Sequence, residues 1–272
     1  MFQGMPAETA PLAASATASS WSRRPSTARA GIAALAGLAL LLLSACSSAP
    51  TDRGEVQGEK FQGGELLQSD SNRMATVAMK QNLESLWLLM EKLYRRNPVE
   101  WKKTAGSREA AMAYVRIAIM ERQPWADLQE RRNVAALSLA LSPGFAGDRV
   151  AAFIYAVADT IITAHGDKTS FTLIDGLDPQ MVFNAARNLE IANWILNSRK
   201  AVGGQPLLFS NQIEDSERNL SFEREMGKII GRLDLIATYT TERYRRALIG
   251  YGQGLVAGPF MQFLPVQAVP VQ

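Results

Sequence analysis

The sequence predicts an all-α protein, a single bundle of six or seven helices behind a flexible N-terminal tether. Apolar residues recur at spacings of three and four over most of the chain after residue 69. Residues that cap helices, together with prolines and glycines that end them, separate these periodic stretches. The sequence shows no repeat of about 34 residues or similar length, so a solenoid is not indicated.

The first half of the body is expected to hold a long helix, two shorter ones and a fourth segment that is one helix or a broken pair. Pro98 cannot continue the first helix but suits the first turn of the second, and Ser107 can cap the third. The expected ranges are 69–97, 98–106, 107–122 and 124–141.

The second half is expected to hold the central helix of the bundle. Residues 146–165 are apolar nearly all round, which indicates a helix buried on most sides. Asp178 and Pro179 read as an N-cap followed by a proline at N1, so another helix should run from there to about Lys200.

The last and longest helix is expected from about residue 211 to about residue 250. Asn211 and Glu214 have the spacing of a capping box, with Asn in place of Ser or Thr. A heptad-like seam then follows for almost four heptads. Its members are Met226, Ile230, Leu233, Ala237, Thr240, Tyr244, Ala247 and Tyr251.

The end of the chain carries no charged residue after Arg246. Gly250, Gly254 and Gly258 are spaced by four, a pattern that lets two helices approach closely. This segment is expected to pack on its own bundle or to dock on a partner, and the alternative is membrane insertion of residues 247–264.

Three arginines, at positions 23, 24 and 29, precede a short apolar run from Gly31 to Leu43 that is too short to span a membrane. The run ends at 43–46 in the letters LSAC. Residues 23–46 therefore resemble the lipobox signal of bacterial lipoproteins. The resemblance implies that Cys46 receives a diacylglyceryl group, that a peptidase removes residues 1–45, and that the freed amine is acylated.

The expected domain limits and the expected cellular location follow from this resemblance. The expected parts are a signal peptide at 1–45, a flexible tether at 46–68, a helical domain at 69–258 and an extended apolar tail at 259–272. Two or three acyl chains on Cys46 would anchor the protein durably to a membrane. By resemblance to enterobacterial lipoproteins, Ser47 after the cysteine favours the outer membrane, facing the periplasm.

Charge and cysteine content exclude several classes of function. Without the three arginines and one glutamate of residues 1–45, the 29 basic and 26 acidic residues become 26 and 25, so nothing suggests a nucleic-acid partner. Cys46 is the only cysteine, which leaves no intramolecular disulfide.

The only histidine, His165, has no second histidine or free thiol with which to form a zinc or thiol–histidine site. We expect it near a helix C-terminus, where its partial positive charge is favoured. Common phosphate-loop, dinucleotide and nucleophile-elbow motifs are absent from the sequence. The sequence therefore predicts no catalytic residue, no cofactor and no metal.

Asp148, Tyr155 and Asp159 fall close to one side of the expected central helix. A buried carboxylate needs a partner or a polar cavity. Asp159 is expected either to form a structural ion pair, with Arg149 or Arg187, or to belong to a ligand-binding stripe.

Four asparagines lie in the helix after Pro179, although asparagine is a poor helix former. The pair Asn184 and Asn188 faces nearly opposite to the pair Asn193 and Asn197. They are expected to bond to neighbouring helices on two sides or to form a polar binding surface.

The sequence favours a lipid-anchored, non-enzymatic scaffold or accessory subunit of an envelope assembly, with a protein partner or further copies of itself. One alternative is a binding module for a small or lipidic ligand, lined by Tyr155, Asp159, Asn184 and Asn188. The other is a glycine-zipper oligomer that inserts its C-terminal segment in the membrane.

Overall fold

The computed structural model describes residues 58, 60, 61, 63–213 and 218–261. The chain divides into two units, Met1–Lys60 and Phe61–Gln272, and nearly all described residues belong to the second. The predicted signal peptide, Cys46 and most of the predicted tether lie outside the described residues.

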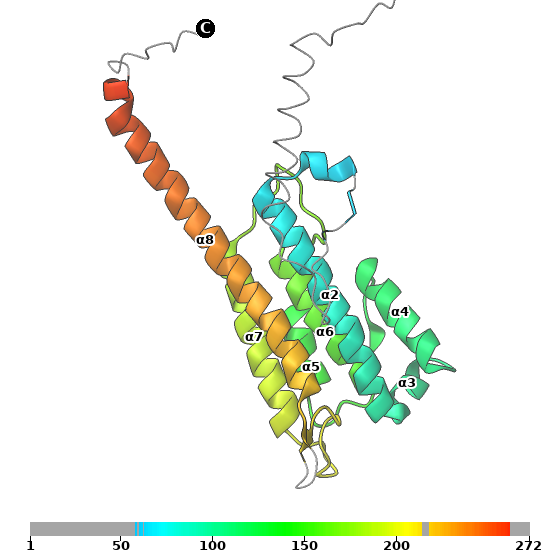
Figure 1. Ribbon diagram of the computed structural model, residues 1–272. Helices are drawn as coiled ribbons and strands as arrows, with labels where there is room; N and C mark the ends of the chain where they lie inside the picture. Colours follow the sequence, from blue (N-terminus) through cyan, green and yellow to red (C-terminus); the bar gives the residue numbers. More distant parts are fainter. Residues whose placement is uncertain (1–57, 59, 62, 214–217, 262–272) are drawn as a thin grey trace, which may run out of the picture. The chain divides into compact units, whose positions relative to one another are not determined.

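The described residues confirm an all-α bundle, with seven α-helices and one short β-hairpin (Figure 1). The α-helices are α2 Asp70–Arg96, α3 Pro98–Thr104, α4 Arg108–Met120, α5 Asn133–Ala140, α6 Arg149–Ala164, α7 Pro179–Ser198 and α8 Ser221–Met261. The remaining elements are the 3-10 turns η1 Gly63–Leu67 and η2 Ala126–Leu128 and the strands β1 Gln212–Ile213 and β2 Arg218–Asn219.

Side-chain caps start three of these helices where the sequence predicts them. The hydroxyl of Ser69 accepts the N–H of Asn72 at 3.3 Å, and the hydroxyl of Ser107 accepts that of Ala110 at 3.1 Å. Asp178 accepts the N–H of Gln180 at 2.8 Å in the same way. These bonds satisfy donors that the first turn of a helix leaves without partners.

Helix α6 is the centre of the bundle. All of its residues except Thr163 are buried, and it contacts α2, α3, α4, α5 and α7. The prediction of a helix covered on nearly all sides is therefore confirmed.

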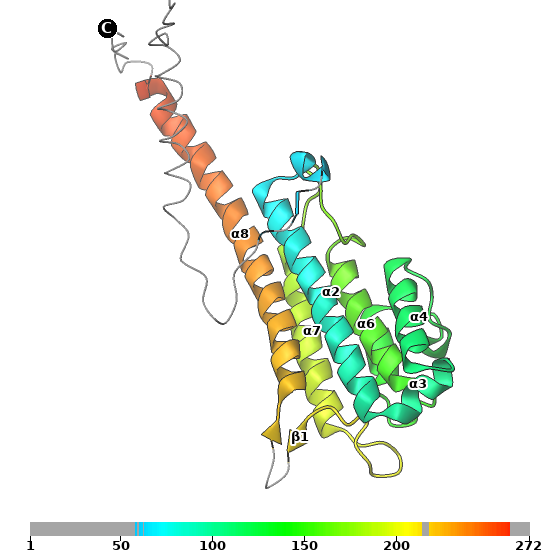
Figure 2. The same ribbon diagram turned by 45° about the vertical axis from the view of Figure 1, so that its right-hand side comes forward.

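Helix α8 packs against α7 and α2, to both of which it runs antiparallel (Figures 1 and 2). The predicted seam is buried at Met226, Leu233, Ala237 and Thr240. Every residue from 243 to 255 is exposed, because α8 continues past the beginnings of α2 and α7 and leaves the bundle there (Figure 2). None of the described helices has a stretch both apolar and long enough to span a bilayer.

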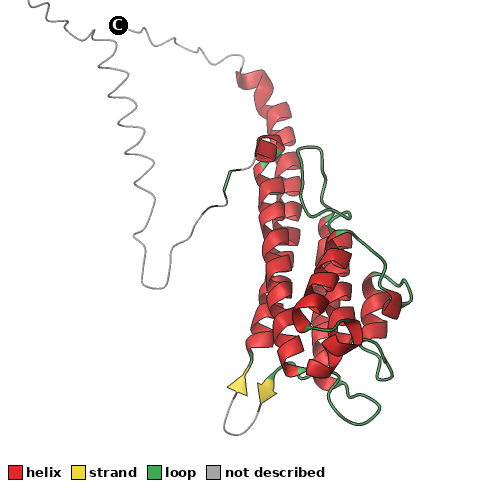
Figure 3. Cartoon of the chain, turned by 90° about the vertical axis from the view of Figure 1, so that its right-hand side faces the viewer, coloured by secondary structure: helices red, strands yellow, loops and turns green. Residues whose placement is uncertain are grey.

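The predicted start of α8 at residue 211 is wrong. Asn211 precedes a β-hairpin in which Gln212 pairs with Asn219 (Figure 3), and the helix begins at Ser221. The Oδ1 atom of Asn211 still accepts the N–H of Glu223 at 3.4 Å, so Asn211 caps α8 from across the hairpin.

Two predicted limits also change. Residues Gly63–Leu67, expected in the tether, form η1, and its Glu65 makes an ion pair with Arg73 of α2 at 2.9 Å. Helix α8 continues through Pro259 to Met261. The predicted extended tail from residue 262 on lies outside the described residues.

Candidate functional site

The polar stripe predicted on α6 is divided between two separate clusters. Asp148 and Asp159 are both buried, and eleven residues of helix place them roughly 16 Å apart along its axis. Each carboxylate has its own set of donors, so the two do not form a carboxylate pair.

Asp148 is the N-cap of α6. Its Oδ1 atom accepts the N–H of Ala151 at 2.9 Å, and its Oδ2 atom accepts the hydroxyls of Tyr94 and Thr104, both at 2.7 Å. Burial raises the pKa of the Asp148 carboxyl, and these hydrogen bonds offset part of the increase. Burial and the nearby Asp148 raise the pKa of Tyr94 as well, so its hydroxyl stays protonated and donates.

Asp159 forms an ion pair, but its partners are not the predicted ones. Its Oδ1 atom lies 2.7 Å from Nη1 of Arg122 and 2.6 Å from Nη2 of Arg132. Its Oδ2 atom accepts the N–H of Asn133 at 2.7 Å. Arg122 and Arg132 belong to the connection between α4 and α5, and Asn133 is the first residue of α5. The sequence placed Arg122 at the end of the third expected helix and the other two in the segment 124–141, which it left as one helix or a broken pair.

The predicted partners, Arg149 and Arg187, bind elsewhere. Arg149 is buried and donates to three backbone carbonyls at the end of α5, which are those of Ala140, Ser142 and Phe145. Arg187 donates to both carboxylate oxygens of Asp234 on α8, at 2.7 and 2.6 Å. The sequence could not rank these pairings, because it does not show which loops fold back on α6.

The connection around Asp159 holds an unusual backbone. Arg122, Gln129, Glu130 and Asn133 all have φ between 51° and 58°, a left-handed conformation that costs non-glycine residues roughly 1–3 kcal/mol each. The contacts to Asp159 come from both ends of this segment, so the buried carboxylate holds the connection in place. No sequence pattern marked these positions.

Tyr155 and the α7 asparagines do not line one ligand cavity. The hydroxyl of Tyr155 donates to the carbonyl of Gln123 at 2.6 Å, and its ring packs 5.7 Å from that of Trp125. Asn184 is exposed and accepts from Gln180 of the same helix at 2.9 Å.

The other asparagine pair bonds a neighbouring helix. The side-chain amides of Asn193 and Asn197 donate to the two carboxylate oxygens of Glu223, each at 2.6 Å. These bonds join the end of α7 to the beginning of α8. One of the two predicted sides is therefore a helix contact.

His165 is the C-cap of α6, but it is not charged there. It is buried, and burial lowers its pKa despite the hydrogen bond from Nδ1 to the carbonyl of Ile161 at 2.8 Å. Desolvation outweighs the favourable field of the helix end. Within the described part of the chain, no group of three acidic, histidine or cysteine side chains could hold a metal ion.

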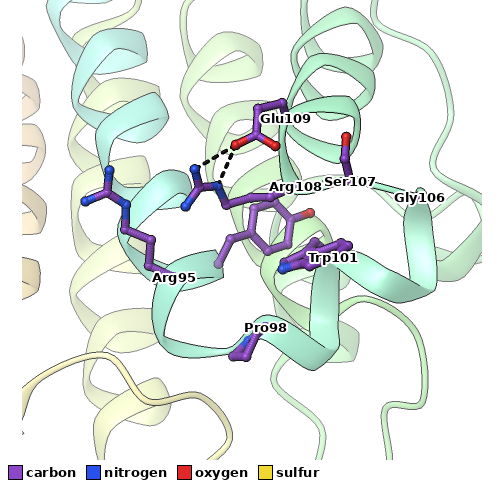
Figure 4. Close-up of a pocket in the computed structure, with 8 residues that line it drawn as sticks. Arg95, Pro98, Trp101, Gly106, Ser107, Arg108 and Glu109 are labelled. Carbon is purple, nitrogen blue, oxygen red and sulfur yellow. Dashed lines mark hydrogen bonds and ion pairs between the residues drawn. The ribbon is translucent and has the colours of Figure 1, made fainter.

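A hollow of about 360 Å³ lies where α2 ends and α4 begins (Figure 4). Its two arginines are paired with carboxylates. Arg95 lies 2.5 Å from Glu91, and Arg108 lies 2.7 Å from Glu109. The hollow therefore offers a ligand no arginine that lacks a carboxylate partner.

A groove of about 230 Å³ runs between α5 and α7, and we call it the α5–α7 groove. Its lining residues are Val134, Leu137, Ser138, Leu141, Asn188, Ile191, Ala192, Ile195 and Arg199. Trp194, one turn along α7 from Ile191, is 68% exposed. This surface is apolar with polar groups at Asn188 and Arg199.

The end of α8 is a second exposed apolar surface, which we call the α8 projection and define as residues 245–261. Leu248 is 74% and Tyr251 70% exposed. A Cβ atom added to Gly250 or Gly254 would meet nothing within 4 Å. Of the two expected roles, packing on its own bundle is not seen at Gly250 or Gly254, because α8 has left the bundle before it reaches them. Docking of these glycines on a partner stays a prediction, and the packing of Gly258 lies outside the described side chains.

Comparisons of the chain with protein-family models, with curated proteins and with solved structures gave no match in any of the three.

Proposed function

We propose that this chain is a lipid-anchored, periplasm-facing envelope protein that acts as a non-enzymatic scaffold or accessory subunit and binds a protein partner through the α5–α7 groove. The anchor rests on the lipobox at residues 43–46. The same resemblance favours the outer membrane as the location. The docking role rests on the groove.

The observation that carries the docking role is the apolar groove, in which Ile191 is still 56% exposed; Trp194, 68% exposed, lies one turn from Ile191 but outside the groove lining. Contiguous exposed apolar surface on a folded domain is typical of an interaction site. Tryptophan is enriched among the residues that dominate binding energy. Asn188 and Arg199 supply the polar groups that fix orientation at such a surface.

The size of the groove favours a protein partner over a small molecule. Small-molecule pockets occupy about 300–1,000 Å³, whereas this groove holds about 230 Å³. That volume suits a few side chains of a partner helix laid between α5 and α7.

Site-specific photo-crosslinking in cells tests this role. A photoreactive residue at Ile191 should join the chain to a specific neighbour, and Trp194→Ala in the same chain should lower the yield. The matched control is Val99 of α3, which is also exposed and should give no such product. Recovery of the monomer alone from position 191 would contradict the docking role.

The anchor is tested separately. A Cys46→Ser chain should remain an unprocessed or soluble precursor, because only the thiol can accept the lipid. Normal processing and normal membrane association of this variant would overturn the lipoprotein assignment without touching the groove.

A second candidate function is a binding module for a small or lipidic ligand, and one observation favours it. An open cleft of about 810 Å³ lies between the beginning of α7 and α8, lined among others by Phe183, Ala237 and Thr238. That volume falls within the range of ligand pockets. Native mass spectrometry should then show a co-purified ligand that Thr238→Phe displaces, and ligand-free protein would exclude this candidate.

A further inference from the structure

The α8 projection places large apolar side chains in water without any cover from the bundle. Leu248, Tyr251 and Leu255 are 62% to 74% exposed, and Ile249 is 43% exposed. Burying such a side chain is worth roughly 1.5–3 kcal/mol. The sequence after Arg246 contains no charged residue up to Gln272. This surface therefore lacks the charged side chains that normally favour exposure of a helix to water.

Leu248, Tyr251 and Leu255 lie within about 60° of one another around the helix and form one seam, whereas Ile249 lies about 100° from Leu248 and about 160° from Tyr251. A second copy packed along that seam would leave Ile249 uncovered. Charged residues that flank the seam of soluble coiled coils are also missing after Arg246. A helix that is apolar on most sides is buried on most sides, in a protein core or in lipid.

A cluster of arginines lies where α8 leaves the bundle. Arg243, Arg245 and Arg246 are all exposed. Arg243 donates to the hydroxyl of Ser71 at 2.6 Å, and Arg245 makes an ion pair with Glu242 at 2.5 Å. Arginines at such a boundary can lay their alkyl chains along apolar surface while their charges reach lipid headgroups.

Cys46, the proposed lipid anchor, precedes in the chain the helix α2 that begins at this end of the bundle. The contact of Arg243 with Ser71 and that of Tyr244 with the carbonyl of Leu177, at 3.2 Å, place this part of α8 beside the beginnings of α2 and α7. Chain that enters α2 comes from Cys46 through η1. The segment between Cys46 and Gly63 spans at most roughly 55–60 Å. A bilayer that holds the acyl chains of Cys46 is therefore within reach of the α8 projection.

We propose that the α8 projection is inserted in the headgroup and upper acyl region of the phospholipid bilayer that carries Cys46, with Arg243, Arg245 and Arg246 at its anionic headgroups. The fifteen helical residues from Ala247 to Met261 are about 22 Å long. This described length is shorter than the roughly 30 Å hydrocarbon core, so it fits within one leaflet. The identity of the bilayer rests on the proposed lipid anchor, whereas the lipid contact itself does not.

A chain of residues 47–272, which keeps every described residue and lacks the anchor, tests the contact. It is mixed with vesicles of phosphatidylethanolamine and phosphatidylglycerol and sedimented. The chain should bind, and Leu248→Asp with Leu255→Asp should weaken binding at least tenfold. The matched control is Leu235→Asp, because Leu235 is 58% exposed on the bundle-packed part of the same helix, and it should bind as the parent does.

Two further measurements separate the sources of binding. Tyr251→Trp should shift its fluorescence to the blue on addition of vesicles. Arg245→Gln and Arg246→Gln should each lower affinity for the anionic vesicles about fivefold. Binding to phosphatidylcholine vesicles, which lack net charge, should be weaker and insensitive to these two changes.

Three results would overturn the proposal. They are an unbound 47–272 chain, equal loss of binding in the Leu235→Asp control, and lipid-free self-association that Leu248→Asp abolishes without any vesicle binding, which would make a second copy the occupant. Since the anchor is absent from this chain, none of them bears on whether Cys46 is lipidated. Failure of the Cys46→Ser test would in turn leave the vesicle result unchanged.

Discussion

Helix α6 and the α8 projection are both poor in charge, yet they lie in opposite environments. α6 is enclosed by five other helices, whereas residues 245–255 of the α8 projection are all exposed. The difference arises from the lengths of the neighbouring helices, because α2 and α7 begin at Asp70 and Pro179 and cover α8 no further than about Tyr244. Apolar composition indicates that a helix will be covered, but it does not say whether the cover comes from the same chain.

The comparison is tested most strongly by the same kind of truncation in both segments. Ile161→Ala on α6 should lower the free energy of unfolding by about 4 kcal/mol, because Ile161 is completely buried and its cavity cannot collapse freely. Leu248→Ala on the projection should change it by no more than about 0.5 kcal/mol. Urea-induced unfolding measures both, and similar losses would show that the projection is packed after all.

The next largest effect is expected at the ion pair on α6. Asp159→Ala leaves Arg132 and the N–H of Asn133 without this acceptor and leaves Arg122 with only Asp167 and Thr163, which should cost about 3 kcal/mol. This lies at the low end for a buried pair, because the two arginine side chains are 25% and 35% exposed and can turn to water. Asp167→Ala, which removes the exposed partner of Arg122, should cost less than about 1 kcal/mol.

The C-cap of α6 gives a pH-dependent effect. The pKa of His165 is lowered by burial, so below about pH 6.5 the unfolded chain takes up a proton that the folded chain does not. The contribution of His165 to the free energy of unfolding is thus complete above pH 6.5. It is lost as the pH falls, by at most about 1.4 kcal/mol per pH unit.

Denaturation of the parent and of His165→Leu at pH 7.0 and 5.5 isolates this contribution, because leucine does not titrate. NMR titration of this single histidine should in addition give a pKa below 6.5 in the folded protein. A value at or above 6.5 would show that the residue is not enclosed.

The smallest effect is expected from alanine in place of Gly250 and Gly254. A Cβ atom has open space at both positions, and alanine favours helix over glycine by about 1 kcal/mol. Since the projection is not packed on the bundle, the gain should appear as slower amide hydrogen exchange in residues 247–258 and leave the urea midpoint unchanged. A destabilised variant would indicate a close neighbour at these glycines.

The sequence was sufficient for the all-α class and for most helix limits. Ser107 and Asp178 cap the helices that they were expected to cap, and Ser69 caps α2 at the first residue of its expected range, because caps act within one turn. The burial of α6 also followed directly from its composition.

The partners of Asp159 and the beginning of α8 did not follow from the sequence, because both depend on contacts between distant segments. Arg122 and Arg132 reach Asp159 only through a left-handed connection, which no local pattern encodes. Asn211 does cap α8, but across a hairpin ten residues before the helix begins, so a rule based on spacing placed the start too early.

The amide bonds from Asn193 and Asn197 to Glu223 attach the first turn of α8 to the end of α7. The last described contact of α8 with the bundle is made by Tyr244. About 17 residues of α8 follow Tyr244, and they form a lever about 25 Å long. A bend of only 10° at Tyr244 moves the tip of this lever by about 4 Å. The angle between the bundle and any surface that binds the tip of α8 is therefore set by a few residues around Arg243.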